Sequence, residues 1–211
     1  MTGRYTGCSQ TAFSKSFRAN SQPITFQIKR SQVISMSKIN YDLSKIRGVV
    51  FDVDGVLSPS AIPLGADGNP CRMANIKDGY ALQLAVRKGL KIAIISGACG
   101  EGLEQRFRNL GIEDVFLKAG VKSQLFEGWM KKHGFAPEEV VYVGDDVPDS
   151  ECMEMAGLAV APADAAADII EIAGYVSPAD GGYGVARDLL EEILRARGEW
   201  PRCDRAWGWN K

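Results

Sequence analysis

Short apolar runs alternate with longer amphipathic segments through most of the chain. The runs are rich in Val, Ile and Ala and have the length of buried strands, whereas the segments between them repeat their apolar residues with a helical period. Such alternation is typical of an α/β fold with a doubly wound, mostly parallel sheet and right-handed crossovers. The expected strands start near Ile46 and span residues 91–96, 114–117, 139–144, 158–161 and 175–176. The expected helices span residues 78–88, 101–110, 122–133, 149–156, 165–172 and 185–197.

One segment breaks this alternation. Residues 57–77 are rich in proline and glycine and show no helical period. They favour a β-hairpin flap that turns at Asp67-Gly68-Asn69. We therefore expect a hairpin between the first strand and the first helix.

The first strand ends in two carboxylates. Asp52 and Asp54 follow the run Val-Val-Phe and precede a glycine. Alternation along a strand places both acids on the same side of the backbone, and like charges that close are costly unless a cation lies between them. The economical interpretation is a Mg²⁺ site at the carboxyl end of a strand, where open α/β sheets bind their ligands. For this tetrapeptide alone, a solvated Asp-Gly turn is the alternative.

Three further motifs follow where other expected elements begin or end. Ser96-Gly97 ends the second strand, Lys122 opens a helix, and the block Gly-Asp-Asp-Val-Pro-Asp149 follows the strand at 139–144. With the Asp-x-Asp motif, and in this order, they resemble the four motifs of the haloacid dehalogenase superfamily of phosphohydrolases over roughly residues 46–197. The set is specific, although each motif alone is a weak signal.

The resemblance implies a role for each matching position. Asp52 would be the nucleophile that accepts the phosphoryl group, and Asp54 would be the general acid and base. Ser96 would hydrogen-bond the phosphoryl oxygens, and Lys122 would neutralise charge on the aspartyl phosphate. The implied Mg²⁺ ligands are Asp52, Asp54 and Asp145, with Asp149 bracing either this metal site or the lysine.

These residue types also suit phosphoryl transfer on chemical grounds. A carboxylate works as a nucleophile when Mg²⁺ and a lysine offset the repulsion between two anions. A second carboxylate can protonate the leaving alkoxide and then activate water. The only histidine, His133, lies at an expected helix end, where a solvated residue is favoured over a catalytic one. Two other classes remain open: a non-catalytic scaffold of the same fold, and a signalling receiver that stays phosphorylated for minutes or longer.

Spacing limits how the site is covered. Only 43 residues lie between Asp52 and Ser96 and only 22 between Lys122 and Asp145. That leaves room for the hairpin but not for the cap domain of the large phosphatases that this chain resembles. An uncapped site must act on a macromolecule, such as a phosphoprotein, or take its lid from another subunit, because a dry site strengthens electrostatic catalysis. The apolar hairpin residues that favour burial against a neighbour are Leu57, Ile62, Leu64 and Met73.

A closer resemblance rests on the hairpin, the segment Asn-Ile-Lys-Asp-Gly-Tyr at 75–80 and the glycine-rich segment at 181–187. These are similar to the capless 3-deoxy-D-manno-octulosonate 8-phosphate phosphatase-like family of lipopolysaccharide synthesis. The resemblance implies a homotetramer with the hairpins at its interface and a 2-keto-3-deoxy sugar-acid phosphate as substrate. The positions implied to bind substrate are Asn75, Lys77, Asp78, Gly97, Arg106 and Arg187. For the two arginines, a solvated helix charge is an almost equal alternative.

One position departs from that family's pattern. The family generally carries a charged residue directly after the Ser-Gly motif, and this chain has Ala98 there. Loss of a charged contact typically changes discrimination between ligands. The identity of the sugar acid, or of another small phosphomonoester, therefore stays open.

The composition suits a cytoplasmic enzyme. The chain has 211 residues, of which 45% are hydrophobic and 24% charged, enough for one domain with a sizeable core. No apolar run approaches the length needed to span a membrane. The five cysteines show no Cys-x-x-Cys pairing and are typical of reduced intracellular thiols. Residues 42–211 carry a net charge of −7, which argues against nucleic-acid binding.

Both ends differ from the body of the chain. Residues 1–41 hold six basic residues and no acidic ones, and the first 35 are polar and unpatterned. We expect a disordered or non-native extension at 1–40, a phosphatase domain at 41–198 and a tail at 199–211. A mitochondrial transit peptide is a less favoured interpretation of the start. In the tail, Trp200, Trp207 and Trp209 either cover a neighbouring subunit or pack loosely.

Overall fold

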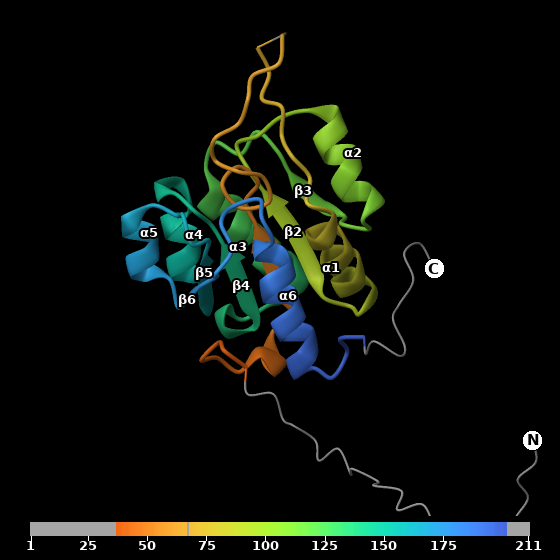
Figure 1. The fold of residues 1–211 in the computed structure, drawn as a ribbon. Helices are drawn as coiled ribbons and strands as arrows, with labels where there is room; N and C mark the ends of the chain where they lie inside the picture. The colour runs from red at the N-terminus through yellow and green to blue at the C-terminus, as the bar shows by residue number, and fades with distance from the viewer. Residues whose placement is uncertain (1–36, 67, 202–211) are drawn as a thin grey trace, which may run out of the picture. The chain divides into compact units, whose positions relative to one another are not determined.

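The computed structural model describes residues 37–66 and 68–201. Its centre is a parallel sheet of six strands in the order β3-β2-β1-β4-β5-β6 (Figure 1). The strands are β1 (Gly48–Phe51), β2 (Lys91–Ile95), β3 (Asp114–Phe116), β4 (Val140–Val143), β5 (Leu158–Ala161) and β6 (Tyr175–Val176). The chain winds outward from β1 in both directions, so the predicted doubly wound α/β fold is confirmed.

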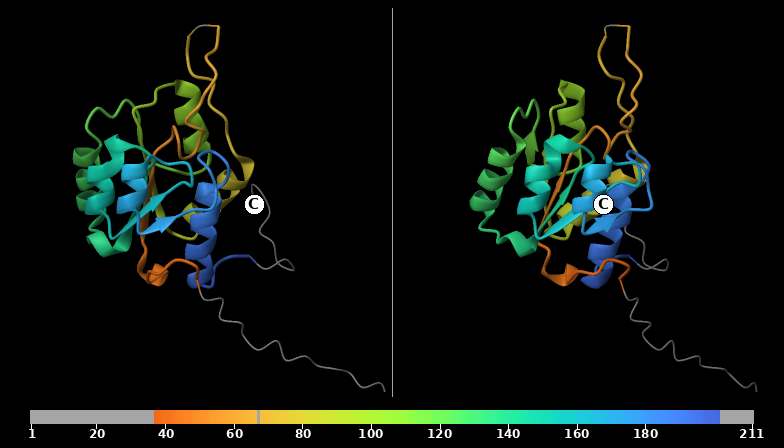
Figure 2. Two further views of the ribbon diagram at one scale, coloured as in Figure 1. Left: turned by 60° about the vertical axis from the view of Figure 1, so that its left-hand side comes forward. Right: turned by 90° about the vertical axis from the view of Figure 1, so that its left-hand side faces the viewer.

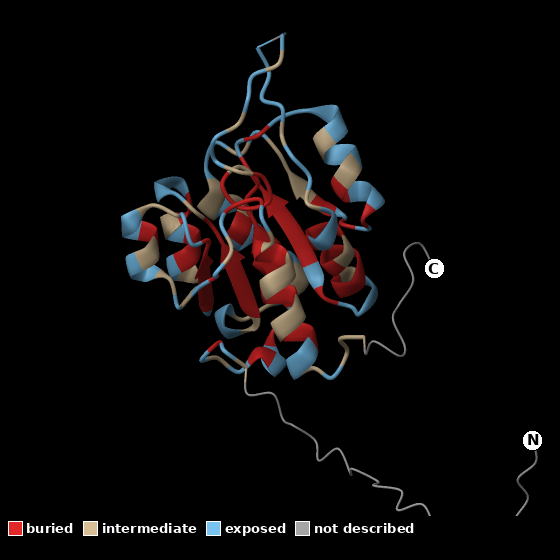
Figure 3. Ribbon diagram, viewed as in Figure 1, coloured by how far each residue is buried: buried red, intermediate tan, exposed pale blue. Residues whose placement is uncertain are grey.

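Helices cover both faces of this sheet (Figure 2). One face packs against α1 (Ile76–Arg87), α2 (Glu101–Asn109) and α6 (Val185–Ala196), and the other against α3 (Lys122–His133), α4 (Ser150–Met155) and α5 (Ala167–Ile172). Short 3-10 helices lie at Leu43–Lys45, Pro137–Glu139 and Val147–Asp149. The four central strands β1, β2, β4 and β5 are almost entirely buried, whereas the edge strands β3 and β6 are less so (Figure 3).

The central strand shows why the chain folds this way. All four residues of β1 are buried; Val49 and Phe51 enter the core beside α1 and α6, and Val50 enters the core beside α3. Alternation therefore supplies an apolar side chain to each layer. Most expected boundaries lie within two residues of those observed. The helix α1 starts two residues before the expected position, because the Asn75 side chain accepts hydrogen bonds from the first-turn amides and caps the helix.

The segment between β1 and α1 projects beyond the carboxyl ends of the strands (Figure 1). It folds back on itself through one antiparallel bridge, between Leu64 and Pro70, and Cys71 N donates to Pro63 O at 2.8 Å. The expected hairpin is therefore present as a loop whose two arms pair without forming regular strands. We call this segment, residues 57–75, the paired loop. Its turn is closed by the Gly68 N to Gly65 O bond, which places the turn slightly earlier than expected; Asp67 lies outside the described residues. No insertion of cap-domain size interrupts the described part of the chain.

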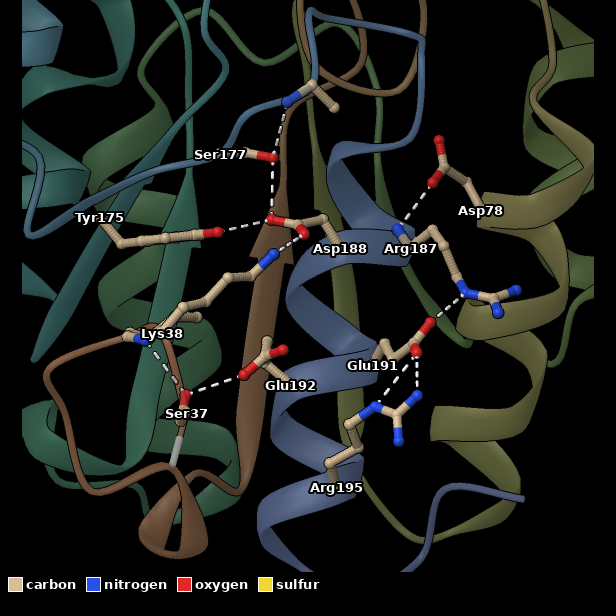
Figure 4. A network of polar contacts seen from close by, with 12 residues as sticks. Ser37, Lys38, Asp78, Tyr175, Ser177, Arg187, Asp188, Glu191, Glu192 and Arg195 are labelled. Atoms are coloured by element: carbon tan, nitrogen blue, oxygen red, sulfur yellow. Dashed lines mark hydrogen bonds and ion pairs between the residues drawn. The ribbon is translucent and has the colours of Figure 1, made fainter. Parts of the chain in front are cut away.

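The described fold extends past both expected boundaries. Lys38 pairs with Asp188, and Ile39 is buried in the core beside α6, so residues 38–40 belong with the domain and not with the extension (Figure 4). At the other end Trp200 packs edge-on against Tyr80 with ring centroids 6.2 Å apart. The expected loose packing is therefore wrong for Trp200, and its contact with a neighbouring subunit stays a prediction; Trp207 and Trp209 lie outside the described residues. Among the described helices, none has the length and apolar character needed to cross a bilayer.

Candidate active site

The carboxylate of Asp52 lies directly after β1, at the point where the strand order reverses. Its backbone amide continues the sheet by donating to Val143 O at 3.0 Å, and its side chain is buried. β1, β2 and β4 are neighbours, so the residues that follow them meet at one edge of the sheet. The predicted convergence of Asp52, Ser96 and Asp145 follows from this topology.

Lys122 is the first residue of α3, and its ammonium group lies between two carboxylates. Its Nζ is 2.9 Å from Asp52 and 2.8 Å from Asp149, and its side chain is only 9% exposed. Burial alone would lower the pKa of this lysine, but the two carboxylates outweigh burial and raise its pKa. The lysine therefore stays charged and fixes both acids.

Asp149 is fully engaged. One of its carboxylate oxygens accepts hydrogen bonds from Lys122 and from the Tyr142 hydroxyl, each at 2.8 Å, and the other lies 3.3 Å from the Asp145 amide. Burial, followed by the charge of Asp149, raises the pKa of Tyr142, so that phenol remains a donor. These contacts suit a brace that orients the lysine and the Asp145 loop.

A divalent cation fits beside these acids. Carboxylate oxygens of Asp52, Asp145 and Asp149 lie within 4.8 Å of one another, and Oδ1 of Asp52 is buried without a hydrogen-bond partner among the described residues. Mg²⁺ favours such hard oxygen ligands. Since both oxygens of Asp149 are already engaged, Asp52 and Asp145 are the better direct ligands. The carboxylate of Asp54 is outside this cluster, so the predicted metal role of Asp54 rests on its backbone carbonyl and stays a prediction.

The electrostatics of the acidic cluster also favour the binding of a cation. Burial and then the charge of Asp149 raise the pKa of Asp52, although Lys122 opposes the shift. Burial, followed by the charges of Asp52 and Asp149, raises the pKa of Asp145 to about 7. Acids that resist ionisation in the protein alone become good anionic ligands once a cation offsets their repulsion.

Asp54 meets a residue that the sequence patterns did not reveal. Arg72, from the paired loop, donates from Nε and Nη2 to the two oxygens of Asp54 at 2.6 and 2.7 Å. The only signal for it in the sequence is that it is the single basic residue between Asp54 and Lys77. A lone charge in an irregular segment has no periodicity that could assign it to a site.

The glycine-rich segment at 181–184 lies against the turn that follows Asp54. A Cβ on Gly181 would lie 2.1 Å from Gly55 O, and a Cβ on Gly55 would lie 1.8 Å from Asp145 Oδ2. Gly182 N donates to Val56 O at 2.8 Å, and Asn75 donates to Gly182 O at 3.2 Å. Close backbone packing therefore links α1, the glycine segment and the acidic turn.

A cavity of about 420 Å³ lies between α1, α2 and the paired loop. The predicted catalytic residues do not line it, but Arg72, which binds Asp54, does. Three of the predicted substrate-binding residues line it, namely Asn75, Asp78 and Arg106, together with Arg72 and several apolar side chains. Lys77 and Gly97 are exposed and do not line it. The structure thus gathers half of the predicted substrate set at one cavity.

Arg187, the remaining member of that set, points elsewhere. Its guanidinium pairs with Glu191 at 2.8 Å and lies over the Trp200 ring, 4.5 Å from the centroid. Its backbone amide donates to Asp78 Oδ1 at 2.7 Å, so Asp78 caps the first turn of α6 (Figure 4). Burial raises the pKa of Asp78 to about 6. Within this protomer the Arg187 side chain packs beside α6 and does not line the cavity, so its predicted part in the glycine-rich closing segment stays a prediction.

His133 also differs from expectation. It ends α3 as predicted, but its ring is only 16% exposed and is not solvated. Nε2 lies 2.8 Å from Asp114, and the ring stacks on Phe135. Asp114 is the first residue of β3, so it lies at the amino-terminal edge of the parallel sheet. The predicted motifs follow the carboxyl ends of the strands, at the opposite edge. The histidine therefore has a packing role.

The parallel fold, the acidic cluster and the buried lysine define a phosphoryl-transfer class of hydrolase. In agreement, a family described as haloacid dehalogenase-like hydrolase matches residues 78–163. The 3-deoxy-D-manno-octulosonate 8-phosphate phosphatase KdsC of Escherichia coli K12 is 38% identical over 154 residues, which are 73% of this chain and 82% of that protein.

Two solved structures agree. The 3-deoxy-D-manno-octulosonate 8-phosphate phosphatase of Yersinia pestis superposes with a TM-score of 0.72 at 33% identity, over 75% of this chain and 85% of that one. The 3-deoxy-D-manno-octulosonate 8-phosphate phosphatase of Moraxella catarrhalis was solved in complex with a magnesium ion, a phosphate ion and KDO. It superposes with a TM-score of 0.70 at 28% identity, over 74% of this chain and 89% of that one. The chain belongs to the KdsC-like family of the haloacid dehalogenase superfamily. It is a phosphoric monoester hydrolase, and Mg²⁺ is the cofactor that its acidic cluster fits.

Proposed function

We propose that this enzyme hydrolyses 3-deoxy-D-manno-octulosonate 8-phosphate, or a related 2-keto-3-deoxy acid phosphate, through an aspartyl phosphate on Asp52. The observation that carries the proposal is one arrangement: Lys122 holds the candidate nucleophile Asp52 at 2.9 Å, and Arg72 joins Asp54 to a cavity that Arg106 also lines. The identity to the KdsC phosphatases supports the substrate class. A place in lipopolysaccharide synthesis follows from that substrate.

In the first step the Asp52 carboxylate attacks phosphorus, and the ester bond to the sugar breaks. Asp54 gives a proton to the departing alkoxide, since its position two residues on suits a general acid. Lys122 and the Ser96 hydroxyl offset charge on the phosphoryl oxygens. Asp52 and Asp145, with Asp149 as a brace, would hold Mg²⁺. When bound, this cation offsets the repulsion between the Asp52 carboxylate and the substrate phosphate.

In the second step water attacks phosphorus, and the bond to Asp52 breaks. Asp54, now a carboxylate, accepts the proton of that water. Inorganic phosphate leaves, and both carboxylates return to their starting states. Each residue acts where the fold holds it, because β1 and the following turn fix both acids.

The cavity suits the organic part of such a substrate. Arg106 lines it as a half-buried cation whose guanidinium forms no ion pair with another described residue. A carboxylate is the natural partner of an unpaired arginine. Asn75 and Asp78 add polar groups at the α1 end of the cavity. Ala98, small and buried, leaves the exact sugar acid open.

We also propose a homotetramer in the cytoplasm, with the paired loop at the subunit interface. Support comes from apolar side chains that project without cover on this protomer, since Leu64 is 71%, Ile76 68% and Met73 49% exposed. Leu57, expected at the interface, is instead buried in the core. Charges placed at Ile62 and Leu64 should dissociate the assembly and raise KM, as sedimentation and kinetics can establish. A fully active wild-type monomer at micromolar concentration contradicts the proposal.

The covalent step can be tested by trapping. An Asp54→Asn variant should keep the nucleophile and lose about two to four decades of turnover, the usual range for general acid–base catalysis. Rapid acid quenching during turnover, followed by peptide mass spectrometry, should find a phosphoryl group on Asp52. The Asp52→Asn variant is the control and should show neither turnover nor modification. A phosphoryl group on another residue contradicts the mechanism.

A further inference from the structure

Arg72 has a geometry that nothing in the reaction scheme above uses. Its Nε–Nη2 edge forms a fork on Asp54, with both donor–acceptor distances below 2.8 Å, and its side chain is 14% exposed. A planar guanidinium has a second edge, formed by Nη1 and Nη2. On that edge Nη1 makes a long hydrogen bond to Cys99 O, at 3.4 Å. The Nε–Nη2 edge of Arg72 is therefore bound to Asp54, and the Nη1–Nη2 edge is available for a second partner.

Arg72 lines the 420 Å³ cavity together with Cys99, the residue that its Nη1 contacts. Most of the cavity wall is apolar. Its charged lining groups among the described residues are Arg72, Arg106 and Asp78. Asp78 is occupied in part by the first turn of α6, at Arg187 N. The cavity is thus set up for an organic anion, with one arginine on each of two walls.

The paired loop holds Arg72 in place before any ligand arrives. Met73 N donates to the hydroxyl of the buried Ser58 at 3.2 Å, and Cys71 N bonds across the loop to Pro63. The residues on both sides of Arg72 are thereby hydrogen-bonded within the loop, and the Met73 bond reaches its buried end at Ser58. A pre-ordered fork loses little entropy when it binds a second carboxylate.

We propose that Arg72 is a substrate-binding residue that bridges Asp54 and the carboxylate of the sugar acid. This inference rests on the proposed function and deepens it, because it names the group that recognises the acid part of the substrate. The Nε–Nη2 edge stays on Asp54 while the Nη1–Nη2 edge takes the substrate carboxylate, displacing the weak contact to Cys99. The bridge fixes the sugar acid relative to Asp54, which acts on the scissile ester.

The test separates binding from turnover by using product inhibition. Free 3-deoxy-D-manno-octulosonate and inorganic phosphate each serve as inhibitors of the holoenzyme with saturating Mg²⁺. In Arg72→Gln the inhibition constant of the free sugar acid should rise about 10- to 100-fold, the range for losing a charge-assisted hydrogen bond. The constant for inorganic phosphate should change less than about threefold on the same reasoning. Arg72→Lys keeps the charge but cannot bridge two carboxylates, so it should recover only part of the affinity.

Arg108→Gln is the matched control, since Arg108 lies on α2, pairs with Glu104 at 3.1 Å and does not line the cavity. It should leave both inhibition constants unchanged. If the Arg72 variants lose kcat while the sugar acid binds as in wild type, Arg72 only positions Asp54, and the inference is overturned while the proposed function stands. If wild type neither hydrolyses the 8-phosphate nor binds the free sugar acid, both fall.

Discussion

Replacing Lys122 by methionine tests whether its charge holds the acidic cluster together. Methionine keeps an unbranched apolar stem and removes the ammonium group that lies 2.9 Å from Asp52 and 2.8 Å from Asp149. Removing one partner of a buried ion pair typically costs about 3–5 kcal/mol, and here two carboxylates lose the same partner. Protonation of Asp145, whose pKa is raised to about 7, limits the loss near neutral pH.

We therefore expect the free energy of unfolding to fall by about 3 kcal/mol at pH 8 in EDTA. For a domain of this size that corresponds to a drop in Tm of about 6–12 °C. Saturating Mg²⁺ should reduce the loss by at least about 1 kcal/mol, because the more negative site binds the cation more tightly. Phosphatase activity should be lost in either condition.

Urea and thermal denaturation, with EDTA and with Mg²⁺, measure both quantities. Lys131→Met is the matched control on the same helix: this lysine is 72% exposed and, among the described residues, forms its ion pair with Glu127 in an i,i+4 contact, so its loss should cost less than about 0.5 kcal/mol. A loss below about 1 kcal/mol for Lys122→Met in EDTA, or an equal loss with and without Mg²⁺, would refute the reasoning.

Three further predictions concern the surroundings of the site. Gly181→Ala should lower stability by about 1–3 kcal/mol and reduce activity, because its Cβ would lie 2.1 Å from Gly55 O. Gly128→Ala on α3, with open space at its Cβ, is the control, and equal effects of the two changes in denaturation would contradict this. Folding raises the pKa of Asp78 from an ordinary 3.8 to about 6, so the folded protein favours its neutral form. The stability that the neutral carboxyl contributes is therefore present below pH 4 and is lost as the pH rises through 6. Asp78→Asn should therefore gain on wild type by up to about 3 kcal/mol between pH 4 and 6.5, and a constant difference in denaturation across that range would show the shift to be absent. Deleting residues 1–35 should leave Tm and activity unchanged, whereas deleting 1–40 also removes the buried Ile39 and should cost at least about 1.5 kcal/mol; equal Tm values for the two deletions would contradict the packing described.

The sequence was sufficient for the parts of the site that follow regular elements. Asp52, Ser96 and Asp145 come after strands, and the carboxyl ends of neighbouring parallel strands meet at one edge. Lys122 opens a helix whose start was visible in the apolar period, and α3 has the expected bounds. Strand alternation and strand order are local and topological rules, so these residues were predictable.

Contacts made by irregular segments were not predictable in the same way. The fork of Arg72 on Asp54 depends on how a loop without period folds back over the sheet. The Arg187 side chain lies away from the cavity because its guanidinium pairs with Glu191, one helical turn later, and stacks over Trp200. His133 became a packing residue because Asp114, 19 positions away, offers it a buried partner. Each outcome is a competition between partners that only the folded chain brings together.

We propose Asp52 as the residue that carries out Mg²⁺-dependent hydrolysis of a sugar-acid phosphate. The most direct measurement is phosphate release from 3-deoxy-D-manno-octulosonate 8-phosphate by the purified full-length protein, with Mg²⁺ and with EDTA, alongside Asp52→Asn. We expect kcat/KM of about 10⁴ M⁻¹s⁻¹ or more for wild type with Mg²⁺, and no release in EDTA or from the variant. Absence of release with Mg²⁺, or undiminished release from Asp52→Asn, contradicts the account.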